Sequence, residues 1–429
     1  MKILMMSVGS RGNVEPFLAI AEMLKDKGHE VVCAFPGQYR VLADEAGVKF
    51  YPLGSEFLDL CCSDLGKLLI GGSLPAFKKA KATVEFYRKS ASIQSDTADI
   101  QREIIESEKP DKILFNQHLA NAKITYPLCW GIKNRAEAIL INPIPYVMHY
   151  VKERSHAMFN ENYGAAINRL TYDIANDGYI RLNLETANKY FRDLRLTRNQ
   201  IKRALMSLKN IFTVSPSIFP RPDYWPRNAM VLGYHERDNV SGWTPDKELA
   251  GFIEQHKKAL LITFGSMVCP DPPARTNLFI DICEKNGIPA IFNLAGGGIA
   301  EPPEYNKNLI KFTPTVPYGW ILPRIYGAIH HGGSGTTQSA LKHGCASMII
   351  PHTADQPLWN NLIYELGAGP KGIAADKLTK EKLEPKILDL WNNPSYKKNA
   401  LKISEKIKLE DYKEELYAAI TEPMSDTAQ

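Results

Sequence analysis

Short apolar runs alternate with amphipathic stretches over the first 53 residues of the chain. Residues 3–8 form a continuous apolar run that ends at Gly9, a pattern typical of a buried strand in a parallel sheet. Residues 14–27 then carry apolar side chains at helical spacing and end before Gly28. The order strand, helix, strand is repeated at residues 31–35, 41–46 and 48–53. This alternation predicts βαβ units and a parallel sheet.

The same order returns further along the N-terminal half, at residues 113–115, 119–130 and 138–141. Two stretches outside it, 55–110 and 145–210, are helical, aromatic and irregular. Ordinary packing of helices accounts for most of their aromatic residues. The alternative interpretation is that some apolar residues in these stretches, such as Phe86 and Met148, line a pocket for a substrate.

A cluster of prolines follows the strand predicted at residues 211–214, and polar sequence continues from there to Lys247. Such a stretch is typical of a linker between domains. We therefore expect an N-terminal domain, a linker, a C-terminal domain and a C-terminal helix that packs back on the N-terminal domain, at residues 1–225, 226–245, 246–400 and 401–429.

The second half restarts the alternation. The apolar runs that predict strands lie at residues 260–264, 290–294, 309–312, 328–330 and 347–351. A helix is predicted at 276–286, and amphipathic helices are predicted at about 379–392 and 395–420. The chain is thus predicted to have an α/β fold with two Rossmann-like, doubly wound domains facing a cleft. Ligands of such sheets bind at the carboxyl ends of the strands.

Composition narrows the class of protein. A length of 429 residues suits two domains, and a net charge of +5 with Lys and Arg scattered among Asp and Glu argues against a nucleic-acid partner. Seven cysteines without a C-x-x-C pair predict reduced thiols in the cytoplasm, not a disulfide framework or a zinc site. The N-terminal apolar run is too short for a signal peptide, and no run of 18 apolar residues predicts a membrane span. Peripheral contact with a membrane is compatible with this sequence.

The strongest local chemical signal is the turn His330-His331-Gly332-Gly333-Ser334-Gly335-Thr336-Thr337, which follows an apolar strand and opens a helix. Its glycines allow the backbone to approach a ligand, its hydroxyls can donate hydrogen bonds, and the start of a helix favours an anion such as a diphosphate. His331 can add a hydrogen bond or a charge. The turn alone is equally typical of a tight strand–helix connection, and without a P-loop lysine it argues against an ATP hydrolase.

Polar residues follow other predicted strands of the same half. Asp355-Gln356, just after the strand at 347–351, combines a carboxylate and an amide that can hold sugar hydroxyls by paired hydrogen bonds. Gly265-Ser266 ends another strand, and residues 315–320 lead into a short helix. We expect these segments to converge on one pocket with the turn at 330–337.

With these motifs, the chain resembles the family-one glycosyltransferases of the GT-B fold, and among them the bacterial macrolide, glycopeptide and sterol glucosyltransferase-like branch. The resemblance covers nearly the whole chain. It rests on Val316-Pro317, Pro323-Arg324, the turn at 330–337, Asp355-Gln356 and the opening loop Gly9-Ser10-Arg11-Gly12-Asn13-Val14-Glu15-Pro16.

The resemblance implies a UDP- or dTDP-hexose as donor, with UDP-glucose favoured, bound by the C-terminal domain without an obligatory metal. Val316 is implied to contact the base through its backbone, with Trp320 near by, and Asp355 and Gln356 are implied to hold the sugar. The residues implied to hold the diphosphate are Ser266, His331, Gly333, Ser334, Gly335 and Thr336. An acceptor hydroxyl on the N-terminal domain is implied to attack the anomeric carbon with inversion.

One residue departs from the family's pattern. The branch has an Asp as catalytic base in the opening loop, whereas this chain has Asn13, and a carboxamide cannot take up the acceptor's proton. Three explanations stay open. The base is another residue, with His118 as the candidate; the acceptor is acidic enough, like a phenol, to need only positioning by Asn13; or Asn13 results from an engineered Asp→Asn change.

The sequence thus predicts an inverting hexosyltransferase that acts on a lipophilic or aromatic small molecule. Sterol, polyketide, flavonoid and lipid acceptors are all compatible with it. Two alternatives are a catalytically silent nucleotide-sugar-binding homologue and a nucleotide-sugar epimerase of the same fold. The long aromatic insertions argue against the epimerase, which needs no acceptor pocket.

Overall fold

The computed structural model describes residues 1–71, 76–116, 124–159, 161–237 and 240–423. The chain divides into two compact units. Unit 1 contains Met1–Leu60, Glu85–Arg237 and Asp411–Gln429, and unit 2 contains Cys61–Val84 and Asp238–Glu410. Each unit is built on one parallel sheet, so the predicted α/β class with two Rossmann-like sheets is confirmed.

Unit 1 holds a seven-stranded sheet in the order β3-β2-β1-β4-β5-β6-β7, with every neighbouring pair parallel. The strands are β1 (Lys2–Met6), β2 (Glu30–Phe35), β3 (Lys49–Pro52), β4 (Lys112–Phe115), β5 (Glu137–Asn142), β6 (Lys209–Phe212) and β7 (Ala229–Val231). The pattern predicts the first six. It misses β7, which lies inside the stretch 226–245 expected as a linker, because three residues among prolines carry no readable alternation.

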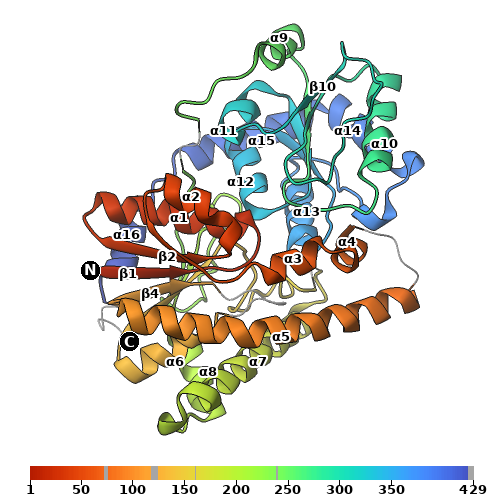
Figure 1. Ribbon diagram of the computed structural model, residues 1–429. Coiled ribbons are helices and arrows are strands. Elements are labelled where there is room, and N and C mark those ends of the chain that lie inside the picture. The colour runs from red at the N-terminus through yellow and green to blue at the C-terminus, as the bar shows by residue number, and fades with distance from the viewer. Residues whose placement is uncertain (72–75, 117–123, 160, 238–239, 424–429) are drawn as a thin grey trace. The chain divides into compact units, whose positions relative to one another are not determined.

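Alternate side chains of unit 1's strands pack on opposite faces of its sheet. Ile3 and Met5 belong to a core with α1 (Arg11–Asp26), α2 (Arg40–Glu45) and α16 (Lys413–Thr421). Leu4 and Met6 belong to a core on the other face, formed with α5 (Ala76–Glu108), α6 (Tyr126–Asn134), α7 (Ala165–Tyr190) and α8 (Arg198–Ser207). Figure 1 shows β1, β2 and β4 between α1 and α2 on one side and α5 on the other. Short elements complete the unit: η1 (Gly37–Tyr39), η2 (Arg192–Leu194) and α3 (Glu56–Cys62), which crosses its boundary.

The last helix, α16, is fastened to unit 1 by polar contacts. Lys27 pairs with Glu414 at 2.7 Å, His29 Nε2 lies 3.0 Å from Tyr417 Oη, and Lys112 Nζ donates to the Ile420 carbonyl at 2.8 Å. The single helix expected over residues 395–420 is therefore wrong. The structure has α15 (Pro394–Lys408) in unit 2 and α16 in unit 1, separated by residues 409–412.

Unit 2 holds a five-stranded parallel sheet in the order β10-β9-β8-β11-β12. Its strands, all predicted, are β8 (Leu260–Thr263), β9 (Ala290–Asn293), β10 (Ile310–Thr313), β11 (Gly327–His330) and β12 (Ala346–Ile349). One face packs on α10 (Pro272–Lys285) and α14 (Lys380–Asn392), and the other on α9 (Lys247–Gln255), α11 (Tyr318–Ile321) and α12 (Ser334–Lys342). The remaining elements are α4 (Asp64–Gly71), α13 (Gln356–Glu365), η3 (Leu322–Arg324) and η4 (Ala375–Lys377).

Candidate functional site

The site in unit 2 is organised by the register of three neighbouring strands. His330, the last residue of β11, pairs with Thr263 at the end of β8 and with Ile349 at the end of β12. Because parallel strands that end at the same level send their following loops to one edge of the sheet, the loops after β8, β11 and β12 lie side by side. The sequence-predicted residues of these loops, Ser266, the 331–336 turn and Asp355, are brought together by this register.

The turn after β11 leads directly into helix α12. Gly332 has a φ of +87°, and a Cβ at this position would lie 2.5 Å from Ile349 Cγ2, so only glycine fits. Gly333 precedes the helix, and its carbonyl accepts hydrogen bonds from Thr337 N at 2.9 Å and Thr337 Oγ1 at 3.0 Å. The first turn, with Ser334, Gly335 and Thr336, thus has the geometry that favours an anion at a helix start.

His331 lies buried between the two glycine-containing loops. A Cβ built on Gly265 would lie 2.8 Å from His331 Cε1, so the ring packs directly on the backbone of the β8 loop. His331 Nδ1 has no hydrogen-bond partner in the described part of the chain. Burial lowers the pKa of His331 to about 4, so the ring is neutral at pH 7. Of the two roles expected for it, a hydrogen bond fits this environment and a charge does not.

The segment with Val316 and Trp320 reaches the same edge of the sheet from a distant strand. It follows β10, three strands away from β11, but the Tyr318 hydroxyl lies 3.1 Å from Thr263 Oγ1 at the end of β8. The Val316 side chain is buried in the core, and the half-buried Trp320 ring lies 5.0 Å from the Trp243 ring. The predicted contact of Val316 with a base requires only its backbone, which its burial does not prevent.

Asp355 and Gln356 sit at the start of α13 in different environments. Asp355 is half-buried, its Oδ2 accepts a hydrogen bond from Trp359 Nε1 at 2.7 Å, and burial raises its pKa to about 6. Gln356 is buried, and its Oε1 accepts from the backbone N–H groups of His352 at 2.7 Å and Thr353 at 3.2 Å. The Gln356 oxygen thus holds its own loop, and Asp355 is the member of the pair with an accessible acceptor.

In unit 1 the opening loop is held by a chain of hydrogen bonds at the ends of β1 and β4. Asn13 is buried in the first turn of α1, and its carbonyl accepts from Ser7 Oγ at 2.9 Å. Asn116 Nδ2 donates to the same Ser7 Oγ at 2.9 Å. Asn116 was not singled out from the sequence. The sequence signal that could have identified it is a polar residue directly after a buried strand. Because β4 pairs with β1, this position lies beside the opening loop.

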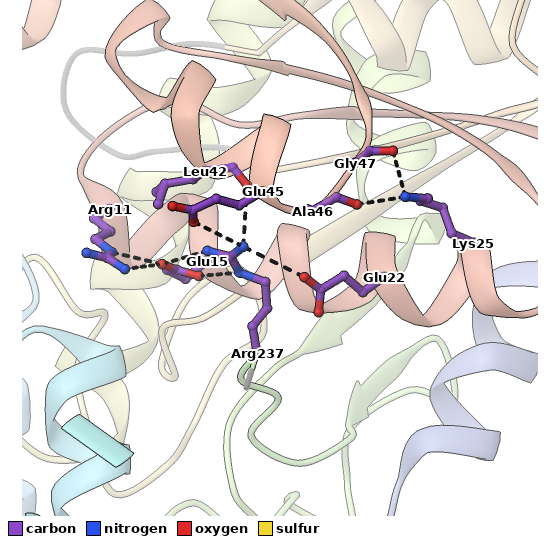
Figure 2. A network of polar contacts seen from close by, with 9 residues as sticks. All are labelled: Arg11, Glu15, Glu22, Lys25, Leu42, Glu45, Ala46, Gly47 and Arg237. Atoms are coloured by element: carbon purple, nitrogen blue, oxygen red, sulfur yellow. Dashed lines mark hydrogen bonds and ion pairs between the residues drawn. The ribbon is translucent and has the colours of Figure 1, made fainter. Parts of the chain in front are cut away.

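A second polar network, drawn in Figure 2, anchors the other side of α1. Glu15 pairs with Arg11 at 2.8 Å and with Arg237 at 2.9 Å, and Arg237 also lies 3.7 Å from Glu22 and donates to the Leu42 carbonyl at 3.3 Å. Burial opposes the charge of Glu15, but hydrogen bonds from Arg237 and the nearby Arg11 hold its pKa below the ordinary value. Arg237 and Glu15 are 222 positions apart in the sequence, so no local sequence pattern predicts their ion pair.

The remaining residues singled out from the sequence are His118, Phe86 and Met148. His118, the candidate base, lies outside the described residues. Phe86 in α5 is buried, and Met148 is buried in the core of unit 1 with a φ of +63°, its carbonyl accepting from Asn176 Nδ2 at 2.9 Å. Within the described ranges, no three His, Cys, Asp or Glu side chains are grouped so that they could hold a metal ion. None of the helices described is long and apolar enough to cross a membrane.

Two family models match separate parts of the chain. Residues 3–104 match the glycosyltransferase family 28 N-terminal domain, and residues 304–421 match the erythromycin biosynthesis protein CIII-like, C-terminal domain. A sterol 3-beta-glucosyltransferase of Arabidopsis thaliana is 29% identical over 423 residues. That alignment covers 96% of this chain and 64% of the plant protein, so the chain spans less than two thirds of its relative's length.

Solved structures share the fold over nearly the whole chain. The calicheamicin glycosyltransferase CalG4 has a TM-score of 0.68 at 13% identity, covering 98% of this chain and 99% of the other. The glycosyltransferase VinC in complex with dTDP has a TM-score of 0.64 at 15% identity, covering 98% of each chain. At these identities the similarity concerns the fold alone.

Proposed function

Since the chain belongs to the glycosyltransferases of the GT-B fold, we propose that it transfers a hexose from a UDP- or dTDP-sugar to a hydroxyl group of a lipophilic or aromatic small molecule. The observation that carries this proposal is the buried His331 ring, whose Nδ1 has no partner among the described residues. His331 belongs to the turn that leads into α12, and its ring packs against the backbone of Gly265 and Gly333. A buried polar atom without a partner is costly unless a ligand satisfies it, and a diphosphate oxygen has the required chemistry.

Each part of the proposed donor meets a group suited to it. The first turn of α12 binds the diphosphate, and the neutral His331 donates a hydrogen bond to one of its oxygens, which stabilises the leaving group as the glycosidic bond breaks. The Asp355 carboxylate accepts hydrogen bonds from sugar hydroxyls. UDP-glucose and dTDP-glucose are the donors to test first, because the plant relative is a glucosyltransferase and VinC was solved with dTDP. A sterol is the first acceptor to test for the same reason.

The acceptor side of the proposal depends on Asn13. With a carboxamide at this position, transfer proceeds with acceptors that lose a proton easily, such as phenols, or with help from another base such as His118. Asn13 also favours one other function, that of a nucleotide-sugar-binding homologue without catalysis. In that case the donor site is used and no bond is broken.

One experiment separates these functions. The purified chain and its Asn13→Asp variant are incubated with UDP-glucose or dTDP-glucose and a panel of sterol, flavonoid and macrolide acceptors, and both the released nucleotide and the product are measured. A glycoside with inverted anomeric configuration is the expected result. If neither form transfers sugar while both bind donor, the chain is a binding protein; if the sugar is converted without acceptor, it is an epimerase.

A further inference from the structure

Arg275 in α10 is a buried arginine that has no acidic partner among the residues the structure describes. Only 7% of its surface is exposed, and it forms no ion pair with a carboxylate in the described ranges of the chain. Burying a guanidinium costs free energy unless its hydrogen bonds and charge are compensated. Packing of α10 alone does not account for this residue, since an apolar side chain would fill the same place at lower cost.

The contacts of Arg275 join two residues from different loops. Its Nη1 donates to His352 Nε2 at 2.8 Å, and its guanidinium lies over the Phe264 ring at 5.2 Å. The Phe264 and His352 rings are themselves 5.5 Å apart. His352 Nδ1 lies 2.8 Å from the Ile350 carbonyl, so this nitrogen carries the proton and Nε2 is free to accept from Arg275.

Phe264 and His352 are the residues from which the loops after β8 and β12 start. Phe264 directly precedes Gly265-Ser266, and His352 opens the loop that ends in Asp355-Gln356. The loops are tied once more at their tips, because Gln356 Nε2 lies 3.2 Å from Met267 Sδ. Since β11 separates β8 from β12, no backbone hydrogen bond of the sheet sets these two loops relative to each other. Arg275 supplies that connection.

We propose that Arg275 is a positioning residue for donor recognition: it holds the β8 and β12 loops together so that Asp355 meets the sugar. This inference rests on the proposed function. Arginine suits the task because a planar guanidinium can stack on Phe264 and donate to an imidazole at the same time, whereas a lysine ammonium makes one point contact. Because β8 is fixed beside β11 in the sheet, the β12 loop with Asp355 is the one that Arg275 positions, and the contacts at α12 and Val316 do not depend on it.

The test compares UDP with UDP-glucose by titration calorimetry, in wild type, Arg275→Met and Arg275→Lys. UDP reports on the α12 side, and the ratio of the two dissociation constants reports on the sugar side. We expect Arg275→Met to bind UDP as wild type does and to bind UDP-glucose about tenfold more weakly relative to UDP, as the loss of one hydrogen bond to a charged group implies. Arg275→Lys should recover part of this loss. In turnover, Arg275→Met raises KM for UDP-glucose and leaves inhibition by UDP unchanged.

Arg221→Met is the matched control, because Arg221 is a partly buried arginine of unit 1 that donates to the carbonyls of Ala229 and Trp225. The Arg221→Met variant should leave the ratio of the UDP-glucose and UDP dissociation constants as in wild type. If Arg275→Met weakens both ligands equally, or neither, the positioning role is refuted. Should this variant fail to fold, Arg275→Lys and His352→Phe give the same test, since each weakens one side of the contact and must raise the dissociation constant of UDP-glucose relative to that of UDP. A wild type that binds neither these ligands nor dTDP and dTDP-glucose overturns the proposed function itself.

Discussion

Replacing Asn13 with Asp should restore a general base at the start of α1. Asn13 is the third residue of this helix, and a carboxylate in the first turn gains about 0.3–1 kcal/mol from the helix start. Ser10 Oγ, 3.4 Å from Asn13 Nδ2, can donate to the new carboxylate, while burial of the residue opposes its charge. The two effects are of similar size, so we expect the free energy of unfolding to change by no more than about 1 kcal/mol.

The effect on catalysis should be much larger than the effect on stability. General-base catalysis contributes about 10²–10⁴-fold, which corresponds to about 3–5 kcal/mol in the activation free energy. The full gain applies to an alcohol acceptor such as a sterol, whose hydroxyl holds its proton tightly. A phenol, with a pKa near that of tyrosine at about 10, gives up its proton more readily and should gain less.

The assay is kcat/KM for one alcohol and one phenol acceptor at saturating UDP-glucose, measured from pH 5 to 9. Asn13→Ala serves as the control, since it removes the amide without adding a base. The activity of Asn13→Asp should fall as acid protonates the new carboxylate, and the wild type should lack this inflection. Equal rates for wild type and Asn13→Asp with the alcohol, or a matching gain in Asn13→Ala, would refute the assignment of this position to the base.

Three further predictions test other parts of the structure. Arg237→Met should lower the free energy of unfolding of unit 1, measured in urea at pH 7, by about 2–4 kcal/mol. This value is on the low side of the cost of breaking a buried ion pair, because a quarter of the Glu15 side chain is exposed. The pKa of Glu15 is lowered in the folded state. The stability difference between wild type and Arg237→Met is therefore complete at pH values above the ordinary pKa of Glu15, and it should shrink as the pH falls through the lowered pKa of the folded state. Gly265→Ala should abolish measurable UDP binding, because its Cβ would lie 2.8 Å from His331 Cε1, whereas Gly287→Ala, at a similar φ but with no atom within 4 Å of the Cβ, should not. Since burial raises the pKa of Asp355 to about 6, UDP-glucose affinity in calorimetry should fall as pH drops below 6, and Asp355→Asn should remove that pH dependence.

Most of the fold could be predicted because its signals are local. Eleven of the twelve strands in the described ranges follow from apolar runs, because strands of a parallel sheet are buried on both faces. Strand β7 and the break between α15 and α16 were missed because their signals are not local. Both depend on what the segment packs against, and the local pattern does not contain that information.

The sequence by itself determined the turn proposed to bind the donor: glycines at 332, 333 and 335 beside hydroxyls after an apolar strand specify a close backbone approach at a helix start. Only the tertiary structure decided how the neighbouring residues act. The pairing of His330 with Thr263 and Ile349 brings three loops to one edge, and burial makes His331 neutral.

The roles of charged and amide side chains were likewise decided by long-range packing. Arg275 and His352 are 77 positions apart, Arg237 and Glu15 are 222 apart, and the Gln356 oxygen proves to hold its own loop. Helical and strand periodicity act over a few residues and can be read along the chain. Hydrogen-bond partners and desolvation depend on which distant segments share a small volume, and only the folded chain establishes that.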